Sequence, residues 1–216
     1  MKRSTILIFV LIFASFAISL LTYSQMPDVM ASHWGYNGEV NGHMPKLGAL
    51  FLMPIISLIM YLFFVFIPKI DPLKDNIRKF SEYYNWFIIV LLAFLFYLHT
   101  LTIAVNLGVD INMNQAFIPA FAFLFFYVGI LLEKAKRNWF IGIRTPWTLS
   151  SDVVWDKTHV LGGKLFKIAA FISVIGLVMP EYAMLFVLVP VLAAAIVSFA
   201  YSYFEYNKEV ARLSKK

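Results

Sequence analysis

Long apolar stretches alternate with short polar segments along the whole chain. Six of them approach the roughly 20 residues that an α-helix needs to cross a bilayer, although the fourth and fifth are shorter than the others. They cover residues 5–23, 47–67, 84–105, 116–132, 165–179 and 182–204. Lys164 and Lys167 can extend their side chains to the membrane surface, so the fifth span can begin before its apolar run. The pattern predicts an all-α fold, an integral membrane helical bundle of six transmembrane helices, in one domain over residues 1–216.

The composition supports a membrane protein. Hydrophobic residues make up 61% of the 216 residues and charged residues only 14%, whereas soluble domains are close to half apolar and a quarter charged. The 22 phenylalanines and 11 tyrosines suit lipid-facing helices with aromatic belts. The chain has no cysteine, which excludes disulfides, thiolate catalysis and cysteine-ligated metal centres. We therefore expect a multi-pass protein of the cell membrane, in contact with the lipid bilayer.

The basic residues indicate an orientation. Six spans place 17 of the 18 lysines and arginines on one side, and the exception is Lys46. The positive-inside rule makes that side the cytoplasm, with the N- and C-termini both cytoplasmic. The net charge of +6 is then explained by topology, so no direct nucleic-acid partner is expected. Lys2 and Arg3 could also begin a signal peptide, but the apolar run is long enough to span and no clean cleavage site follows it, which favours an uncleaved first helix.

A polar loop, residues 24–46, joins the first two spans and completes an N-terminal helix pair over residues 1–67. The charge count places this loop outside the cell. It contains the stretch SHWGYNGEVNGHMPK, in which Asn37-Gly38 and Asn41-Gly42 are strong turn dipeptides. We expect a compact Ω-loop rather than a free tether.

Two histidines of the outer loop are weak metal candidates. His33 and His43, with Asp28 or Glu39, could hold a metal, but their separation of ten residues matches no usual ligand spacing. Hydrogen bonding within the loop is favoured for these histidines, with Trp34 and Tyr36 at the membrane interface. We therefore predict no metal and no cofactor.

Residues 133–163 form the largest cytoplasmic segment. Three tryptophans lie there at the expected depth of the membrane surface: Trp139, Trp147 and Trp155. Ser150 is the expected N-cap of a short interfacial helix from residue 151 to about residue 161, which two glycines would end. Trp155 and His159, four residues apart, should share one face of that helix.

Isolated polar residues offer further candidates. Arg144 could bind an anion, a lipid headgroup or a carboxylate partner, or it could contribute only to topology, and the residues leave these alternatives open. His99 lies within the third span, where an interhelical hydrogen bond is favoured over a functional role. The chain carries no hydrolase, metalloprotease or P-loop motif, and no acidic residue lies mid-span to support a proton relay. The sequence therefore predicts a protein that is not an enzyme.

Two segments resemble known signatures. MPDVMASHWGYNGEVNGHMPK is similar to the P-x-x-[IVM]-[PA]-[ST]-H-[WF] signature of a domain of unknown function, found near the N-terminus of many small bacterial and archaeal membrane proteins. NWFIGIRTPWTLSSDVVWDKTHVLGGKLF resembles the longer and more specific signature of the SdpI family, the immunity proteins against a secreted sporulation-delay peptide toxin. The two motifs occur in this order in that family, so the resemblance covers nearly the whole chain.

The resemblance implies a function and a set of residues. It implies protection against an extracellular peptide toxin and a second role in signal transduction, in which a soluble ArsR-like repressor is held at the membrane. In the outer loop, the candidates for toxin recognition are His33, Trp34, Gly38, Asn41 and Lys46. The cytoplasmic motif, a candidate for partner binding or for stabilising the bundle, comprises Asn138, Gly142, Arg144, Thr145, Pro146, Trp147, Thr148, Trp155, His159 and Gly163. Asn41 stands where many members have Asp, which weakens a metal or carboxylate role there.

Two other classes of function remain as alternatives. A membrane enzyme or transporter for small molecules could use His33, His43 and Arg144. An accessory membrane subunit would need none of these residues for chemistry. Stoichiometric zinc that is lost in a His33→Ala protein would favour the enzyme or transporter.

Overall fold

The computed structural model describes residues 3–36 and 38–214, and these residues form helices and one small hairpin. Six of the helices are long and apolar enough to cross a membrane: 4–25, 46–70, 81–106, 113–134, 152–177 and 180–213. The predicted all-α membrane bundle with six spans is confirmed. Lys2, Lys215 and Lys216, which contribute to the charge count, and Asn37 of the first turn dipeptide lie outside the described residues.

The elements follow one another in a simple order. The α-helices are α1 Arg3–Thr22, α2 Lys46–Ile70, α3 Lys74–Lys79, α4 Ser81–Asn106, α5 Met113–Lys134, α6 Pro146–Ser150, α7 Asp152–Ser173 and α8 Ala183–Leu213. The two strands are β1 Val29–Trp34 and β2 Val40–Pro45, and the short 3-10 turns are η1 Tyr23–Gln25, η2 Val174–Leu177 and η3 Pro180–Tyr182.

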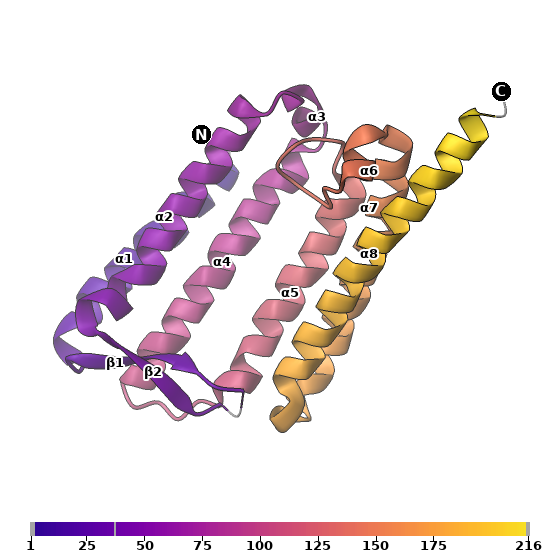
Figure 1. Cartoon of the computed structure of the whole chain (residues 1–216). Helices are drawn as coiled ribbons and strands as arrows, with labels where there is room; N and C mark the ends of the chain where they lie inside the picture. Colours follow the sequence, from indigo (N-terminus) through magenta and orange to yellow (C-terminus); the bar gives the residue numbers. More distant parts are fainter. Residues whose placement is uncertain (1–2, 37, 215–216) are drawn as a thin grey trace.

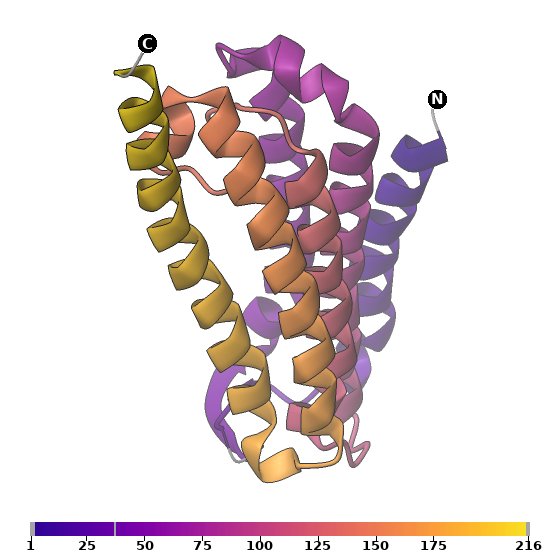
Figure 2. The same ribbon diagram turned by 90° about the vertical axis from the view of Figure 1, so that its right-hand side faces the viewer.

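The long helices pack as two groups of three. Helices α1, α2 and α4 contact one another, α7 packs against both α5 and α8, and α4 beside α5 joins the groups. Both ends of the chain lie at one end of the bundle, together with α3 and α6, while β1 and β2 lie at the other (Figures 1 and 2). We call these the motif end and the hairpin end. The assignment of the motif end to the cytoplasm stays a prediction.

Helix α7 differs from the predicted short interfacial helix. It begins at Asp152 and continues without a break through Gly162 and Gly163, so the predicted end at these glycines is wrong. The glycines allow close helix packing instead, because a Cβ on Gly163 would lie 2.6 Å from the carbonyl oxygen of Gly129 in α5. The N-cap also shifts by one residue, since Ser151 rather than Ser150 accepts the hydrogen bond from the Val154 amide at 3.2 Å.

The outer loop is a β-hairpin rather than the predicted Ω-loop. Strands β1 and β2 pair antiparallel, with irregular register around His33. Two backbone bonds close the turn: the Gly35 amide donates to the Glu39 carbonyl at 2.8 Å, and the Gly38 amide donates to the Gly35 carbonyl at 2.9 Å. Gly38 has φ of +83°, which favours glycine. The strand sequences VMASHW and VNGHMP show no regular alternation of polar and apolar residues, so the sequence pattern does not indicate the hairpin.

A polar contact joins three helices inside the first group. The Ser19 hydroxyl of α1 donates to the Leu50 carbonyl of α2 at 2.7 Å and lies 2.9 Å from Nε2 of His99 in α4. His99 is fully buried there. The predicted interhelical hydrogen bond of His99 is therefore confirmed.

Candidate functional site

The hairpin is fastened to the ends of α4 and α5. The side-chain amide of Asn106 makes two hydrogen bonds to the backbone of Ala31. Its Oδ1 accepts from the Ala31 amide at 2.8 Å, and its Nδ2 donates to the Ala31 carbonyl at 3.0 Å. At the turn between the strands, Asn114 Nδ2 donates to the Tyr36 carbonyl at 2.6 Å. Met30 is fully buried and packs in one apolar cluster with Leu50. The hairpin is therefore a fixed part of the bundle.

Lys46 closes the base of the hairpin. Its ammonium group lies 3.0 Å from the Asp28 carboxylate, and its backbone amide donates to the Asp28 carbonyl at 2.9 Å. The same ammonium group lies over the Tyr23 ring, 5.3 Å from its centroid. Only 18% of the Lys46 side chain is exposed. These contacts favour a structural role for Lys46 over direct recognition.

Of the other recognition candidates, some are exposed on the hairpin and some pack against α5. His33 Nδ1 is hydrogen-bonded to Oδ1 of Asn41, and both residues are exposed. Trp34 instead packs edge-to-face on Phe117 of α5, with centroids 6.3 Å apart. Gly38 lies against α5, since a Cβ there would be 3.5 Å from the Asn114 amide nitrogen. The exposed pair His33 and Asn41 is thus one polar feature that the hairpin presents, beside exposed Glu39 and His43.

Tyr36 was not among the predicted site residues. It stands at the hairpin turn with 81% of its surface exposed, beside the turn glycines. Sequence reasoning placed the loop's aromatic residues at the membrane interface, and only the hairpin geometry shows that this ring projects from the tip. An exposed aromatic residue flanked by polar groups is typical of binding surfaces.

The two metal candidates do not gather with a third ligand. Among the described residues, no group of three or more His, Asp or Glu side chains is placed to hold a metal ion. His33 uses its Nδ1 in the bond to Asn41, and His43 lies opposite Ala31 on the neighbouring strand.

At the motif end, Asn138 organises the loop between α5 and α6. Its Oδ1 accepts from the amides of Phe140 at 2.9 Å and Ile141 at 2.6 Å. Its Nδ2 donates to the carbonyls of Lys136 at 2.8 Å and Ile141 at 2.9 Å. Asn138 is fully buried. Its whole hydrogen-bonding capacity is used to fold the loop.

The same loop is bound to the segment between α2 and α4. Buried Asp71 accepts from the Trp139 amide at 2.9 Å and from the Leu73 amide at 2.6 Å. Asn76 of α3 donates to the Arg137 carbonyl at 2.9 Å. The sequence prediction missed Asp71 and Asn76, although the Asp71-Pro72 dipeptide is a turn signal that could have drawn attention to the first.

Helix α6 is fastened to α8. Thr145 caps it, because its hydroxyl accepts from the Thr148 amide at 3.1 Å while the Thr148 hydroxyl accepts from the Thr145 amide at 2.9 Å. Pro146 follows at the first helical position, which suits its missing N–H. The Thr145 hydroxyl also lies 3.0 Å from that of Ser202 in α8. Trp147 packs edge-to-face on two aromatic rings of α8, with centroids 5.3 Å from Phe199 and 5.1 Å from Tyr203.

Trp155 and His159 are brought together as predicted. Both are buried on one face of α7. The Trp155 indole N–H donates to the Ala135 carbonyl at 2.9 Å, and the Ile143 amide donates to Nε2 of His159 at 3.0 Å. Gly142 has φ of +116°, and a Cβ there would collide with Nε2 of His159. Most of the motif therefore holds the loop in one conformation.

Arg144 is the exception, because it is exposed and lines a cavity. Its Nη1 donates to the Trp139 carbonyl at 2.7 Å. The cavity has a volume of about 410 Å³ and lies below the loop, between residues of α2, α4, α5 and α7. Its other lining residues are apolar.

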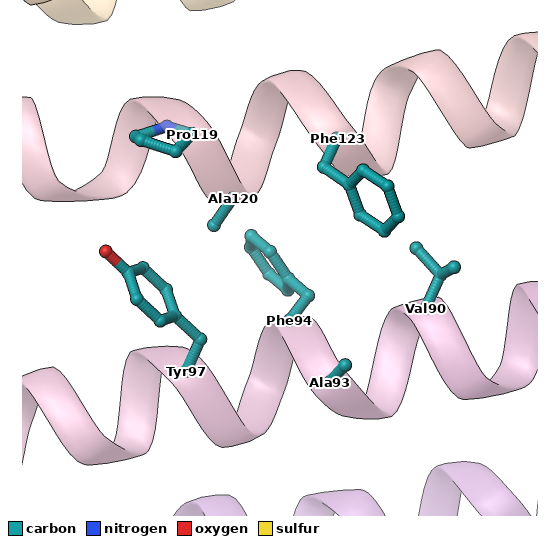
Figure 3. A pocket seen from close by; sticks show the side chains of 7 residues that line it. All are labelled: Val90, Ala93, Phe94, Tyr97, Pro119, Ala120 and Phe123. Carbon is teal, nitrogen blue, oxygen red and sulfur yellow. The ribbon is translucent and has the colours of Figure 1, made fainter.

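A second, smaller cavity of about 260 Å³ lies between α4 and α5 (Figure 3). It is lined by Val90, Ala93, Phe94, Tyr97, Pro119, Ala120 and Phe123. The Tyr97 hydroxyl donates to the Ala116 carbonyl at 3.0 Å, so the one polar lining side chain is already bonded within the bundle. This cavity offers apolar contacts only.

The fold and the two ends define a class of protein. It is a multi-pass helical membrane protein of six spans, with a docked hairpin at one end and an ordered loop motif at the other. Residues 134–202 match the SdpI/YfhL protein family, and residues 10–58 match a domain of unknown function, DUF1648. The resemblance to the SdpI family is confirmed.

A curated relative supports this family. The chain is 28% identical over 209 residues to the immunity protein SdpI of Bacillus subtilis (strain 168), which covers 96% of this chain and 98% of that protein. The similarity thus includes the hairpin and the loop motif in one alignment. No solved structure matches the chain.

Proposed function

We propose that this chain is a membrane immunity protein that protects the cell that makes it from a secreted antimicrobial peptide. The identity to the immunity protein SdpI over nearly the full length of both chains supports this class of function. The proposed protection acts by binding at the membrane, where a membrane-active peptide must arrive.

One observation carries the proposal for the site. The hairpin is held rigidly by Asn106 and Asn114, yet it presents the exposed pair His33 and Asn41. A surface that is already ordered loses little conformational entropy on binding, which favours recognition of a flexible peptide. We infer that the pair His33 and Asn41, with Tyr36 beside it, contacts the toxin on the outer side of the membrane.

A second role in signalling stays a prediction. Arg144 and half-exposed Trp139 are among the loop residues that a cytoplasmic repressor could reach, whereas Asn138 and His159 are buried within the fold. Recruitment of an ArsR-like repressor to the membrane should therefore fall in Arg144→Ala if this role exists. Unaltered recruitment would remove it.

Expression in toxin-sensitive cells tests the immunity proposal. Cells that carry the chain should survive concentrations of the sporulation-delay peptide that kill cells with an empty vector. The same cells should remain sensitive to an unrelated pore-forming peptide, because the proposed protection depends on recognition. Survival equal to the empty vector, at confirmed membrane expression, would reject the proposal.

A further inference from the structure

The cavity of about 410 Å³ at the motif end is larger than the cavity of about 260 Å³ between α4 and α5. Phe87 of α4 and the α5 residues Val128 and Leu131 line it. Phe63 of α2 and Phe166 of α7 also line it, one from each helix group. Its volume falls within the range of roughly 300–1,000 Å³ that small-molecule sites occupy.

The cavity reaches the side of the bundle that faces lipid. Phe63 lines it and has 49% of its surface exposed on a spanning helix, from which we infer a lateral opening between spans. A hydrocarbon chain from the bilayer can enter such an opening without crossing water.

The lining of the cavity carries one positive charge. Arg144 contributes the charged group among the lining residues, and one of its five N–H donors is used by the Trp139 carbonyl. In the described part of the chain, Arg144 has no acidic partner within 4.0 Å. Two neighbouring acids of the motif end already have basic partners, since Glu133 pairs with Lys167 at 2.6 Å and Asp152 with Arg137 at 2.7 Å.

We propose that this cavity binds an anionic phospholipid, with an acyl chain between α2 and α7 and the headgroup phosphate on Arg144. A guanidinium offers phosphate two parallel N–H donors, which makes Arg well suited to this contact. The apolar lining supplies the affinity for the chain, and the single charge supplies selectivity for an anionic headgroup. The bound lipid would seal the interface between the two helix groups, independently of any toxin.

Lipid binding to the purified full-length protein tests the proposal. Phosphatidylglycerol and phosphatidylethanolamine are titrated in detergent and the bound lipids are counted by native mass spectrometry. We expect phosphatidylglycerol to bind about tenfold more tightly, because phosphatidylethanolamine carries an ammonium group that offsets the charge of its phosphate and is repelled by Arg144. Arg144→Gln should abolish this preference, and Arg144→Lys should retain part of it.

Further variants separate the contribution of the acyl chain to binding from that of the headgroup. Val128→Phe fills the cavity and should weaken both lipids, while Lys69→Gln removes an exposed charge at the same end, outside the cavity, and should change neither. Inorganic phosphate at equal concentration should not displace phosphatidylglycerol, because it lacks the chain. Melting temperatures and gel filtration confirm that each variant is folded.

Three outcomes would overturn the proposal. The first is equal binding of the two lipids by the unchanged protein. The second is an equal loss in Lys69→Gln and Arg144→Gln, which would assign the preference to general surface charge. The third is undiminished binding of both lipids in Val128→Phe, which would place the bound lipid outside the cavity.

Discussion

The indole of Trp155 stacks on the imidazole of His159, with ring centroids 3.9 Å apart and planes inclined by 15°. The two rings hold opposite ends of the motif loop, because Trp155 donates to the Ala135 carbonyl and His159 accepts from the Ile143 amide. His159 Nδ1 lies 2.9 Å from the Trp155 carbonyl, which requires its proton on Nδ1 and leaves Nε2 as the acceptor. The imidazole is therefore neutral and has a structural role.

Replacing His159 should destabilise the protein. His159→Ala leaves the partly buried Ile143 amide without its acceptor and removes the stacking on Trp155, at a cost of about 2–4 kcal/mol. Thermal unfolding in detergent measures the loss. His43→Ala is the control, because His43 is exposed on the hairpin and its loss should stay within about 0.5 kcal/mol. Equal melting temperatures for the two variants would contradict the structural role of His159.

Two glycines with similar backbone angles should respond differently to alanine. Gly142 has φ of +116° and Gly108 has φ of +89°, so both substitutions cost about 1 kcal/mol in backbone strain. A Cβ on Gly142 also collides with His159, whereas nothing lies within 4 Å of one on Gly108. Gly142→Ala should therefore be about 1–3 kcal/mol more destabilising than Gly108→Ala in the same unfolding measurement. Equal effects would show that the loop is free to move away from α7.

Asn106 should control the order of the hairpin. Asn106→Leu removes both bonds to Ala31, so hydrogen exchange at the Ala31 amide should accelerate about tenfold or more. Exchange in the middle of α4 should stay slow. Asp110→Asn, an exposed change in the segment after α4, provides the control. Unchanged exchange at Ala31 in Asn106→Leu would mean that strand pairing alone fixes the hairpin.

The sequence predicts the bundle more completely than the site. The number of spans follows from hydropathy, because each lipid-exposed helix must be apolar along its whole length. The distribution of basic residues among the loops agrees with this number. The end of α7 cannot be predicted in the same way. In the sequence alone Gly163 indicates the end of a helix, whereas in the structure it allows α7 to pack closely on Gly129 of α5. Contacts between segments that are distant in the sequence determine whether such a glycine ends a helix or allows close packing.

The same limit applies to the candidate residues. The sequence singles out the motif positions Asn138, Trp155 and His159. The structure shows that Trp155 and His159 are bonded to Ala135 and Ile143, which no sequence pattern marks. Lys46 appears as an isolated outer charge in the sequence, whereas the structure pairs it with Asp28. Pairing of Asn41 with His33 requires the strand register, which the irregularity around His33 obscures.

The absence of cysteine from the chain permits a direct test of orientation. A single Tyr36→Cys at the hairpin tip should react with a membrane-impermeant maleimide in intact cells, since this position is 81% exposed and is predicted to lie outside. Asp75→Cys, on exposed α3 at the other end, should react only after the cells are permeabilised. The reverse pattern of labelling would invert the predicted topology.

The proposal that the hairpin recognises the toxin is tested most directly by the survival of toxin-sensitive cells that express His33→Ala. At membrane levels equal to the unchanged protein, we expect the protective toxin concentration to fall about tenfold, as for the loss of one binding contact worth about 1.4 kcal/mol. Asn41→Ala should have the same effect, because it removes the partner of His33, while Asp110→Asn at the same end should protect fully. Undiminished protection by both His33→Ala and Asn41→Ala would contradict a recognition role for the hairpin.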